Sequence, residues 1–213
     1  MDEKDVKIIL IGESGVGKTS IIRRYHFNKF EENIDPTFTP TFITKTIIRD
    51  NIIYRLNIWD TVGQEKYYSI TKSSLQGADI VILVYSIDRI DSFKKLDYWN
   101  QKIKDICSDN LILSIVGNKC NLFEKDDIQL VPDEDVEKYA KEKNAIFKLV
   151  SAKKDNKGIN TFFEQLLDEY IKKCLIFEKG EKNMSFKTKY KNIKKKIVVR
   201  LYFYSEFKFF SLI

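Results

Sequence analysis

The string "GESGVGKTS", residues 12–20, combines three glycines with an adjacent lysine and threonine. It fits the pattern G-x-x-x-x-G-K-[ST], in which glycines let the backbone wrap closely around phosphate groups and direct its N–H groups inward. Lys18 would neutralise β- and γ-phosphates, and Thr19 would offer its hydroxyl to Mg²⁺. The pattern predicts a binding loop for a nucleoside triphosphate. The expected phosphate contacts are Ser14, Gly15, Val16, Gly17, Lys18, Thr19 and Ser20.

A second motif, "WDTVGQE" at residues 59–65, carries groups that suit hydrolysis of such a ligand. Asp60 could hold an Mg²⁺-bound water, and Gly63 could offer its backbone N–H to a γ-phosphate. Gln64 could orient an attacking water. Alone, this string is typical of a turn. Beside a phosphate loop, it indicates a nucleoside triphosphatase.

These motifs need strands that bring them together, and the hydrophobic pattern predicts six. Four apolar runs are near-continuous in Val, Ile and Leu, which is typical of strands covered on both faces. Two further runs alternate between apolar and polar residues and are joined by Asp50–Asn51, which predicts an antiparallel hairpin. The expected strands are 6–12, 42–49, 52–59, 79–86, 111–117 and 145–151.

Helix-period stretches lie between these strands. Their alternation with the strands predicts an α/β doubly wound fold, whose six-stranded sheet is mostly parallel with one antiparallel hairpin and has helices on both faces. In such folds ligands bind at the carboxyl ends of the strands, where both motifs fall. The expected helices are 17–27, 65–76, 91–107, 133–143 and 158–176.

The two motifs together resemble the small GTPases, and the Rab branch in particular, over residues 6–176. The resemblance implies the small-GTPase form of the phosphate-loop fold. Thr37, 18 residues beyond Thr19, stands where the family has the switch threonine that binds Mg²⁺ and the γ-phosphate, and Phe30 where an aromatic edge packs on guanine. The strings "GNKCN" and "SAK" match the two base-reading loops, which implies base contacts from Asn118, Lys119, Asn121, Ser151, Ala152 and Lys153.

For activity, the resemblance implies a switch that slowly hydrolyses GTP to GDP and phosphate, with GTP/GDP and Mg²⁺ as ligands. The implied catalytic residues are Gln64, Lys18 and Thr37. Mg²⁺ would be held by Thr19, Thr37 and, through water, Asp60. No arginine in the motifs is an obvious internal finger, so rapid hydrolysis is expected to need a GTPase-activating protein. An exchange factor and effectors complete the implied partners.

The effector surface departs from the family. Rab effectors commonly dock on an aromatic trio, of which Phe42 and Trp59 hold two positions while Ser74 holds the third. Partners of known Rabs therefore cannot simply be transferred, although Phe42 and Trp59 remain the expected apolar anchors. The γ-phosphate is expected to order the switch segments near 31–44 and 61–76, and hydrolysis to release them.

Asn121 replaces the aspartate that reads guanine in this family. The aspartate accepts hydrogen bonds from guanine N1–H and from the exocyclic N2 amine, whereas an asparagine has one acceptor oxygen and one NH₂ donor. Its NH₂ would meet the guanine amine donor to donor, but would suit the O2 of xanthine. The sequence therefore predicts weakened guanine specificity and a shift toward xanthosine nucleotides.

The chain divides by charge into a GTP-binding domain, residues 1–177, and a basic, aromatic-rich tail, residues 178–213. The domain has 27 basic and 28 acidic residues, which argues against a nucleic-acid partner, and we expect a monomer. The tail has ten basic and three acidic residues and lacks the cysteines that Rabs use for prenylation. It either contacts anionic membrane or does little. The Rab resemblance implies a cytoplasmic protein peripheral on endomembranes, and the string "FITKTI" leans toward endosomes.

Two other functions compete with the GTPase switch. One is a nucleotide-binding pseudo-GTPase scaffold with altered base specificity, which Asn121, Ser74 and the missing prenylation cysteines favour. The presence of Lys18, Thr37 and Gln64 favours the active switch instead. The other is a phosphate-loop kinase, which would need a substrate-binding insert and an arginine-bearing lid, and the short links between the expected elements leave no room for them.

Overall fold

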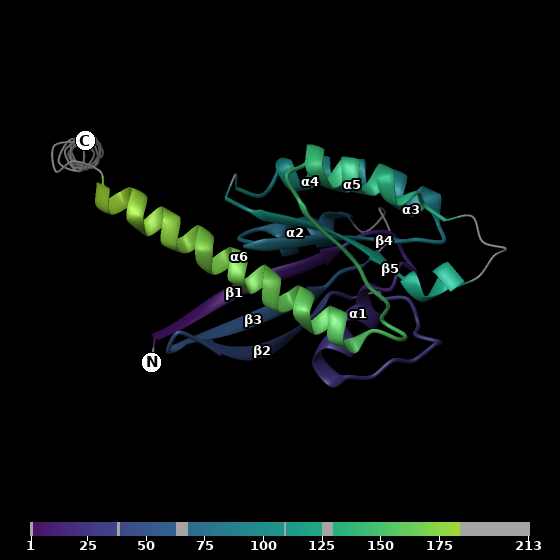
Figure 1. Cartoon of the computed structure of the whole chain (residues 1–213), viewed down its shortest axis with the longest axis horizontal. Coiled ribbons are helices and arrows are strands. Elements are labelled where there is room, and N and C mark those ends of the chain that lie inside the picture. Colours follow the sequence, from purple (N-terminus) through teal and green to yellow (C-terminus); the bar gives the residue numbers. More distant parts are fainter. Residues whose placement is uncertain (1, 38, 63–67, 109, 125–129, 184–213) are drawn as a thin grey trace, which may run out of the picture. The chain divides into compact units, whose positions relative to one another are not determined.

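The computed structural model describes residues 2–37, 39–62, 68–108, 110–124 and 130–183, and its strands and helices alternate along the chain (Figure 1). The strands are β1 (Asp2–Ile11), β2 (Thr41–Arg49), β3 (Ile52–Asp60), β4 (Ile80–Ser86), β5 (Ile112–Asn118) and β6 (Ile146–Leu149). The helices are α1 (Lys18–Phe27), α2 (Tyr68–Leu75), α3 (Ile90–Lys94), α4 (Leu96–Lys104), α5 (Asp133–Glu142) and α6 (Asn156–Asn183), with a 3₁₀ turn at Cys120–Glu124.

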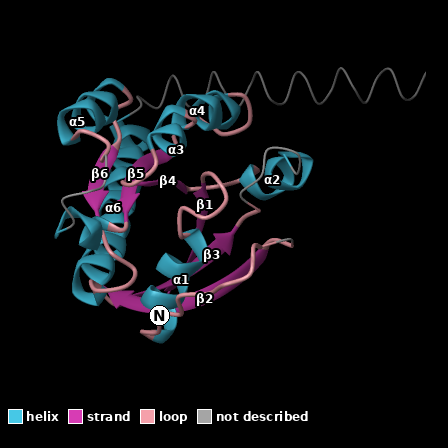
Figure 2. Cartoon of the chain, turned by 90° about the vertical axis from the view of Figure 1, so that its right-hand side faces the viewer, coloured by secondary structure: helices cyan, strands magenta, loops and turns pink. Residues whose placement is uncertain are grey.

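The six strands form one sheet in the order β2-β3-β1-β4-β5-β6 (Figure 2). Only β2 and β3 pair antiparallel, and the other neighbours are parallel. Every residue of β4 and all but one of β5 are buried, as expected for strands covered on both faces. The predicted fold class, a mostly parallel sheet with one antiparallel hairpin, is therefore confirmed.

The β2–β3 hairpin turns at Asp50 and Asn51. Both residues have positive φ, 48° and 62°, as a two-residue type I′ turn requires. Asn and Asp tolerate this left-handed conformation better than most residues because their short polar side chains bond locally. The turn predicted at this dipeptide is confirmed.

One face of the sheet packs against α2, α4 and α5. Ile9 of β1, Val81 of β4 and Ile115 of β5 lie in the same buried cluster as Trp99 of α4 and Val136 of α5, and all five are fully buried. Such burial of large apolar side chains provides the main driving force for folding.

The opposite face carries α1 and the first part of α6. The rings of Tyr25 in α1 and Phe163 in α6 stack with centroids 3.9 Å apart. Lys45 of β2 donates a hydrogen bond from Nζ to the Tyr25 carbonyl at 3.0 Å, which joins α1 to the edge strand. Helices therefore cover both faces, as the sequence predicts.

Several boundaries differ from the expected ones. Helix α6 runs to Asn183 rather than to residue 176, and strand β6 covers Ile146–Leu149 rather than residues 145–151.

Strand β1 begins at Asp2 rather than at residue 6, because its backbone pairs with β3 from Asp2 opposite Ile52 onward. Arg55 of β3 also forms ion pairs with Glu3 at 2.6 Å and Asp5 at 3.0 Å along this extension. The helix expected over 91–107 is divided into α3 and α4.

The break between α3 and α4 lies at Lys95, whose ψ of −7° departs from helical values. Leu96 and Trp99, which follow the break, are both buried in the core, and the Lys95 ammonium lies 3.3 Å from the carboxylate of Glu13 in the phosphate loop.

Residues 1–170 form one compact unit, and the division from residues 171–213 falls inside α6. Among the described helices, none combines the length and apolar composition needed to cross a bilayer.

Candidate functional site

The phosphate loop joins the end of β1 to the start of α1. Gly17 has a φ of 94°, and a side chain there would overlap the amide of Asn118. Gly12 lies so close to the carbonyl of Val84 that any side chain would displace β4. Only glycine fits at these two positions, so the loop keeps its close approach to the strands on each side.

Lys18 opens α1 and is only 6% exposed. Its ammonium donates to the carbonyls of Gly12 at 2.8 Å and Glu13 at 2.9 Å. Burial lowers the pKa of Lys18 to about 8, while the nearby charges of Asp60 and Glu13 oppose that fall. A cation held this way is positioned inside the loop where phosphate groups would sit.

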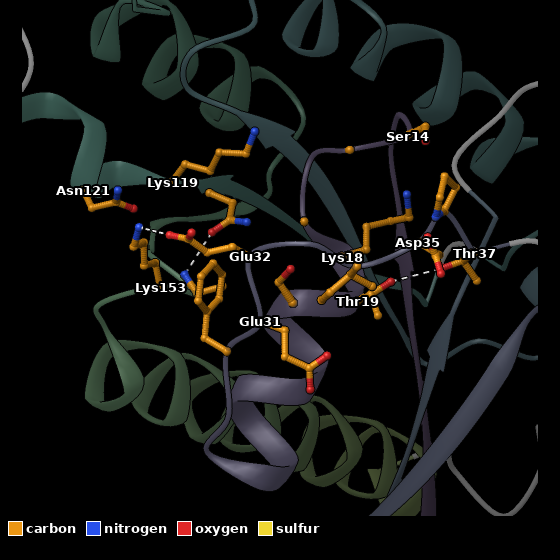
Figure 3. A pocket seen from close by; sticks show the side chains of 18 of the residues that line it. Ser14, Lys18, Thr19, Glu31, Glu32, Asp35, Thr37, Lys119, Asn121 and Lys153 are labelled. Atoms are coloured by element: carbon orange, nitrogen blue, oxygen red, sulfur yellow. Dashed lines mark hydrogen bonds and ion pairs between the residues drawn. The ribbon is translucent and has the colours of Figure 1, made fainter.

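Three oxygen-bearing side chains meet beside Lys18. The Thr19 hydroxyl donates to Asp60 Oδ2 at 2.7 Å and lies 3.0 Å from the Thr37 hydroxyl. The Thr37 hydroxyl lies 3.4 Å from the same carboxylate oxygen. The sequence places Thr19 on α1, Asp60 at the end of β3 and Thr37 in the loop before β2, and the fold brings the three together. Figure 3 shows the contact between Thr19 and Thr37.

This cluster fits a magnesium ion. Asp60 is 6% exposed, and within the described residues its Oδ1 has no hydrogen-bond partner. Burial raises the pKa of this carboxyl, although Thr19 and Lys18 oppose the rise. Hydroxyl and carboxylate oxygens are the ligands that Mg²⁺ prefers, and a divalent cation would stabilise the buried carboxylate.

The part of the site that the sequence predicts to contact the base, called the base end below, is built around Asn118, the last residue of β5. Its amide Nδ2 donates to the Val16 carbonyl at 2.9 Å, and its Oδ1 accepts from the backbone N–H of Ala152 at 3.1 Å. Asn118 is 2% exposed and ties the phosphate loop to the loop after β6. Its amide therefore has a positioning role.

Asn121 lies in the 3₁₀ turn after β5. Its Oδ1 accepts a hydrogen bond of 2.6 Å from the Ser151 hydroxyl, which in turn accepts from the backbone N–H of Lys154 at 3.1 Å. The chain of bonds fixes the amide so that its oxygen is directed at Ser151. A carbonyl oxygen has two lone pairs, so one acceptor site and the NH₂ group remain for a base.

Two arginines outside the motifs also hold these loops. Arg24 of α1 donates from Nε to the Ala152 carbonyl at 2.7 Å and from Nη2 to the Lys153 carbonyl at 2.9 Å. Arg89 donates from Nη1 to the Ser14 carbonyl at 2.7 Å. Neither arginine is predicted from the sequence, because the partners of both are backbone carbonyls, which leave no mark in the residue pattern.

Acidic residues also surround the site. Lys119 lies 3.6 Å from the Asp88 carboxylate, and the Lys153 ammonium forms an ion pair with Glu32. Glu31 pairs with Arg23 of α1.

The loops enclose a cavity of about 450 Å³, a size typical of small-molecule and cofactor sites. In Figure 3 the labelled side chains form two groups, with Lys18, Thr19 and Thr37 at one end and Asn121 and Lys153 at the other. The predicted site residues that line it are Ser14, Gly15, Gly17, Lys18, Thr19, Ser20, Phe30, Thr37, Asn118, Lys119, Asn121, Ala152 and Lys153.

Some predicted site residues lie elsewhere. Val16 and Ser151 are buried behind the lining. Asp60 lines an adjoining cavity of about 430 Å³, which shares Thr19 and Thr37 with the first. Gly63 and Gln64 lie outside the described residues, so their predicted roles remain predictions.

The two predicted effector anchors lie next to each other on the β2–β3 hairpin. Phe42 is 56% exposed and stacks on Trp59 with ring centroids 5.0 Å apart. Lys7 places its ammonium 5.0 Å from the Trp59 ring centroid. Ser74, at the third position of the family's trio, is buried. The exposed apolar surface therefore consists here of two stacked rings.

A doubly wound sheet with a phosphate loop after β1, a buried carboxylate at the end of β3 and polar loops after β5 and β6 defines a phosphate-loop nucleotide-binding protein. The model of the Ras family matches residues 7–172. Mouse Rab-31 is 38% identical over 150 residues, which cover 70% of this chain and 75% of Rab-31. Human Rab-22A is 35% identical over 150 residues, which cover 70% of this chain and 76% of Rab-22A.

The chain belongs to the Ras family and is a Rab-type small GTPase. It binds guanine nucleotide, hydrolyses GTP and acts in membrane trafficking. These findings confirm the family, the fold and the activity predicted from the sequence. The alternative of a pseudo-GTPase scaffold is not favoured by them.

Proposed function

We propose that this GTPase binds GTP with Mg²⁺ along the described cavity, phosphates at Lys18 and base at Asn121. The observation that carries this proposal is the convergence of the Thr19, Thr37 and Asp60 oxygens, within 3.4 Å of one another, beside the buried Lys18 ammonium.

Each residue at the phosphate end then has a role. Thr19 and Thr37 would hold Mg²⁺ and Asp60 would hold it through water, and the ion would supply positive charge to the phosphate groups. Lys18 transfers its hydrogen bonds from the Gly12 and Glu13 carbonyls to the phosphates. Positioning and charge stabilisation of this kind account for most of the catalysis in phosphoryl transfer.

Hydrolysis needs a water in line with the γ-phosphate. We assign its orientation to Gln64 and a γ-phosphate hydrogen bond to the backbone N–H of Gly63, as the resemblance implies. Arg89 bonds to the Ser14 carbonyl and does not line the cavity, so it does not act as an arginine finger. Fast turnover therefore depends on a GTPase-activating partner.

Thr37 couples the bound nucleotide to the conformation of the switch segments. Its hydroxyl reaches Thr19 and Asp60 in the structure, so the loop before β2 is drawn toward the phosphate end. Loss of the γ-phosphate removes one partner of Thr37 and releases segments 31–44 and 61–76. Effectors would read that change through Phe42 and Trp59.

At the base end, Asn121 changes which purine base the site prefers. With its oxygen held by Ser151, the amide can accept N1–H from a purine and donate to an oxygen at C2. Guanine has an amine there and xanthine an oxygen, so xanthosine nucleotides gain a bond that guanosine nucleotides lack. GTP remains the ligand in a cell that holds far more of it.

For location, we propose a monomer peripheral on endomembranes, with the endosome as its compartment. The relatives named Rab-31 and Rab-22A support a trafficking role. The tail, residues 178–213, is the proposed contact with anionic lipid, because its basic residues precede an aromatic-apolar end.

Phosphate release from GTP tests this proposal, with and without Mg²⁺ and in Gln64→Leu. Gln76→Leu is the matched control, since Gln76 is exposed in the loop after α2. We expect hydrolysis to require Mg²⁺ and to fall about tenfold or more in Gln64→Leu while nucleotide affinity stays within twofold, because Gln64 would touch only the attacking water. Equal rates in the two glutamine variants would remove Gln64 from the mechanism.

A further inference from the structure

Two loops from distant parts of the chain meet at the mouth of the base end. Lys153 lies in the loop after β6, and Glu32 lies in the loop after α1. Their ammonium and carboxylate groups form an ion pair, which Figure 3 shows as a dashed line beside Asn121. Both residues line the cavity.

The Lys153 side of this contact is anchored. Arg24 of α1 binds the carbonyls of Ala152 and Lys153, at 2.7 and 2.9 Å. Ala152 also donates its backbone N–H to the buried Asn118 side chain at 3.1 Å. The loop after β6 is therefore held from two directions, and the Lys153 ammonium extends from a fixed backbone.

The Glu32 side belongs to a connection that has to move. The chain from Asn28 to Pro40 links α1 to β2 without a helix or strand in its described residues, and Glu31, Glu32 and Asp35 are exposed. The connection carries Phe30 and Thr37, which line the cavity on either side of Glu32. The ion pair therefore joins this connection to the loop after β6 across the base end of the cavity.

We propose that the Glu32–Lys153 pair is a clasp that closes the base end of the cavity and slows nucleotide release. The inference rests on the proposed nucleotide site. Glu32 is a positioning residue in it, because it holds Lys153 and the connection rather than the nucleotide itself. The clasp does not distinguish guanine from xanthine, so it slows the release of both.

The charges suit this role. The hydrogen bond and the charge of Lys153 lower the pKa of the Glu32 carboxyl, so the carboxylate form is favoured at neutral pH. Both side chains are largely solvent-exposed, at 67% for Glu32 and 49% for Lys153. Exposed ion pairs are weak and screened by salt, so the clasp adjusts the rate of release without locking the nucleotide in.

Release of a fluorescent GDP analogue from the full-length protein, chased with excess GDP, tests the clasp in a charge-swap cycle. We expect Glu32→Lys to accelerate release about two- to fivefold, because it places two ammonium groups opposite each other. In a Lys153→Glu background the same substitution should slow release, because the swapped pair reforms. This reversal of sign is what a clasp predicts and what a general disturbance of the loop does not produce.

Glu31→Lys is the matched control, with the same charge change one residue away. Glu31 pairs with Arg23 of α1 and points away from Lys153 in Figure 3. Glu31→Lys should change the rate of release by the same factor in the wild type and in the Lys153→Glu background. Thermal unfolding of each variant checks that the fold is retained.

Salt gives a second measurement on the native residues. Release from the wild type should accelerate as salt is raised and approach the rate of Glu32→Gln near molar salt, where the screening length is about 3 Å. If Glu32→Lys accelerates release equally in both backgrounds, or Glu32→Gln matches the wild type at low salt, the clasp is wrong. Failure of the wild type to retain any GDP analogue would instead contradict the nucleotide site itself.

Discussion

The two ends of the cavity are built differently. At the phosphate end Lys18 and Asp60 are each 6% exposed, and their partners are backbone carbonyls and hydroxyls of the same small cluster. At the base end Asn121 is partly exposed and Lys153 is exposed, and side chains from separate loops hold the site together.

This difference indicates which end of the cavity tolerates amino-acid substitution. Charges interact more strongly in a buried, weakly polarisable environment than in water, so we propose that the phosphate end carries most of the affinity. Solvent and salt weaken contacts at the base end. In our proposal this end sets the base selectivity and the rate of nucleotide release. The family pattern is intact at the phosphate end for the described residues, whereas Asn121 departs from it at the base end.

The largest expected effect comes from Lys18→Ala. Removing one partner of a buried charge contact costs several kcal/mol, so GDP affinity should fall about 100-fold or more, equally for guanine and xanthine nucleotides. Lys29→Ala, at an exposed lysine just after α1, is the control. Calorimetric titration measures both. A loss in Lys18→Ala no larger than in Lys29→Ala would break the contrast between the two ends.

A pH dependence should follow from the same residue. The pKa of Lys18 is about 8 without nucleotide, and negative phosphates raise the pKa of a bound ammonium. Below pH 8 the free protein already carries the proton. Above it, binding must take up a proton, so affinity should fall by up to about tenfold for each further pH unit until the bound-state pKa is reached.

Calorimetry in buffers of different ionisation enthalpy measures that proton uptake. Uptake should be small near pH 7 and grow through pH 8 to 9. Release of protons over this range, or affinity that rises with pH, would contradict the assignment of Lys18 to the phosphates.

Arg89→Ala should have a smaller effect. It removes a hydrogen bond of 2.7 Å from a charged donor to the Ser14 carbonyl and leaves the cavity lining unchanged. We expect nucleotide release about three- to tenfold faster, with the same factor for guanine and xanthine nucleotides, and partial rescue by Arg89→Lys. If release of guanine and xanthine nucleotides accelerated by different factors, Arg89 would act at the base end. That result would contradict the contrast between the two ends of the cavity.

The sequence predicts the phosphate end well and the base end only in part. The strands, the Asp50–Asn51 turn and the phosphate loop follow from local patterns, because hydrophobic periodicity and glycine positions act over a few residues. The prediction that Thr37 and Asp60 belong to one site came from the resemblance to the Rab family and not from a local pattern.

Long-range side-chain contacts were not predictable in the same way. Lys153 and Glu32 are 121 residues apart in the sequence, and Arg24 and Ala152 are 128 apart. The sequence around an exposed glutamate, or around an arginine on a helix, does not indicate which residue that side chain contacts. The division of α3 from α4 at Lys95 escaped prediction for a related reason, because it depends on the core that Trp99 enters.

The most direct test of the account is the ratio of dissociation constants for GDP and XDP, measured for the wild type and for Asn121→Asp. The two ligands share the same phosphates and sugar, so the ratio isolates the base end. We predict that the wild type binds XDP at least as tightly as GDP, and that Asn121→Asp tightens GDP about tenfold or more and reverses the preference, since an unpaired buried donor costs roughly 1–3 kcal/mol. A wild type that prefers GDP over XDP by orders of magnitude would contradict this reading of Asn121 and show that another group reads the guanine amine.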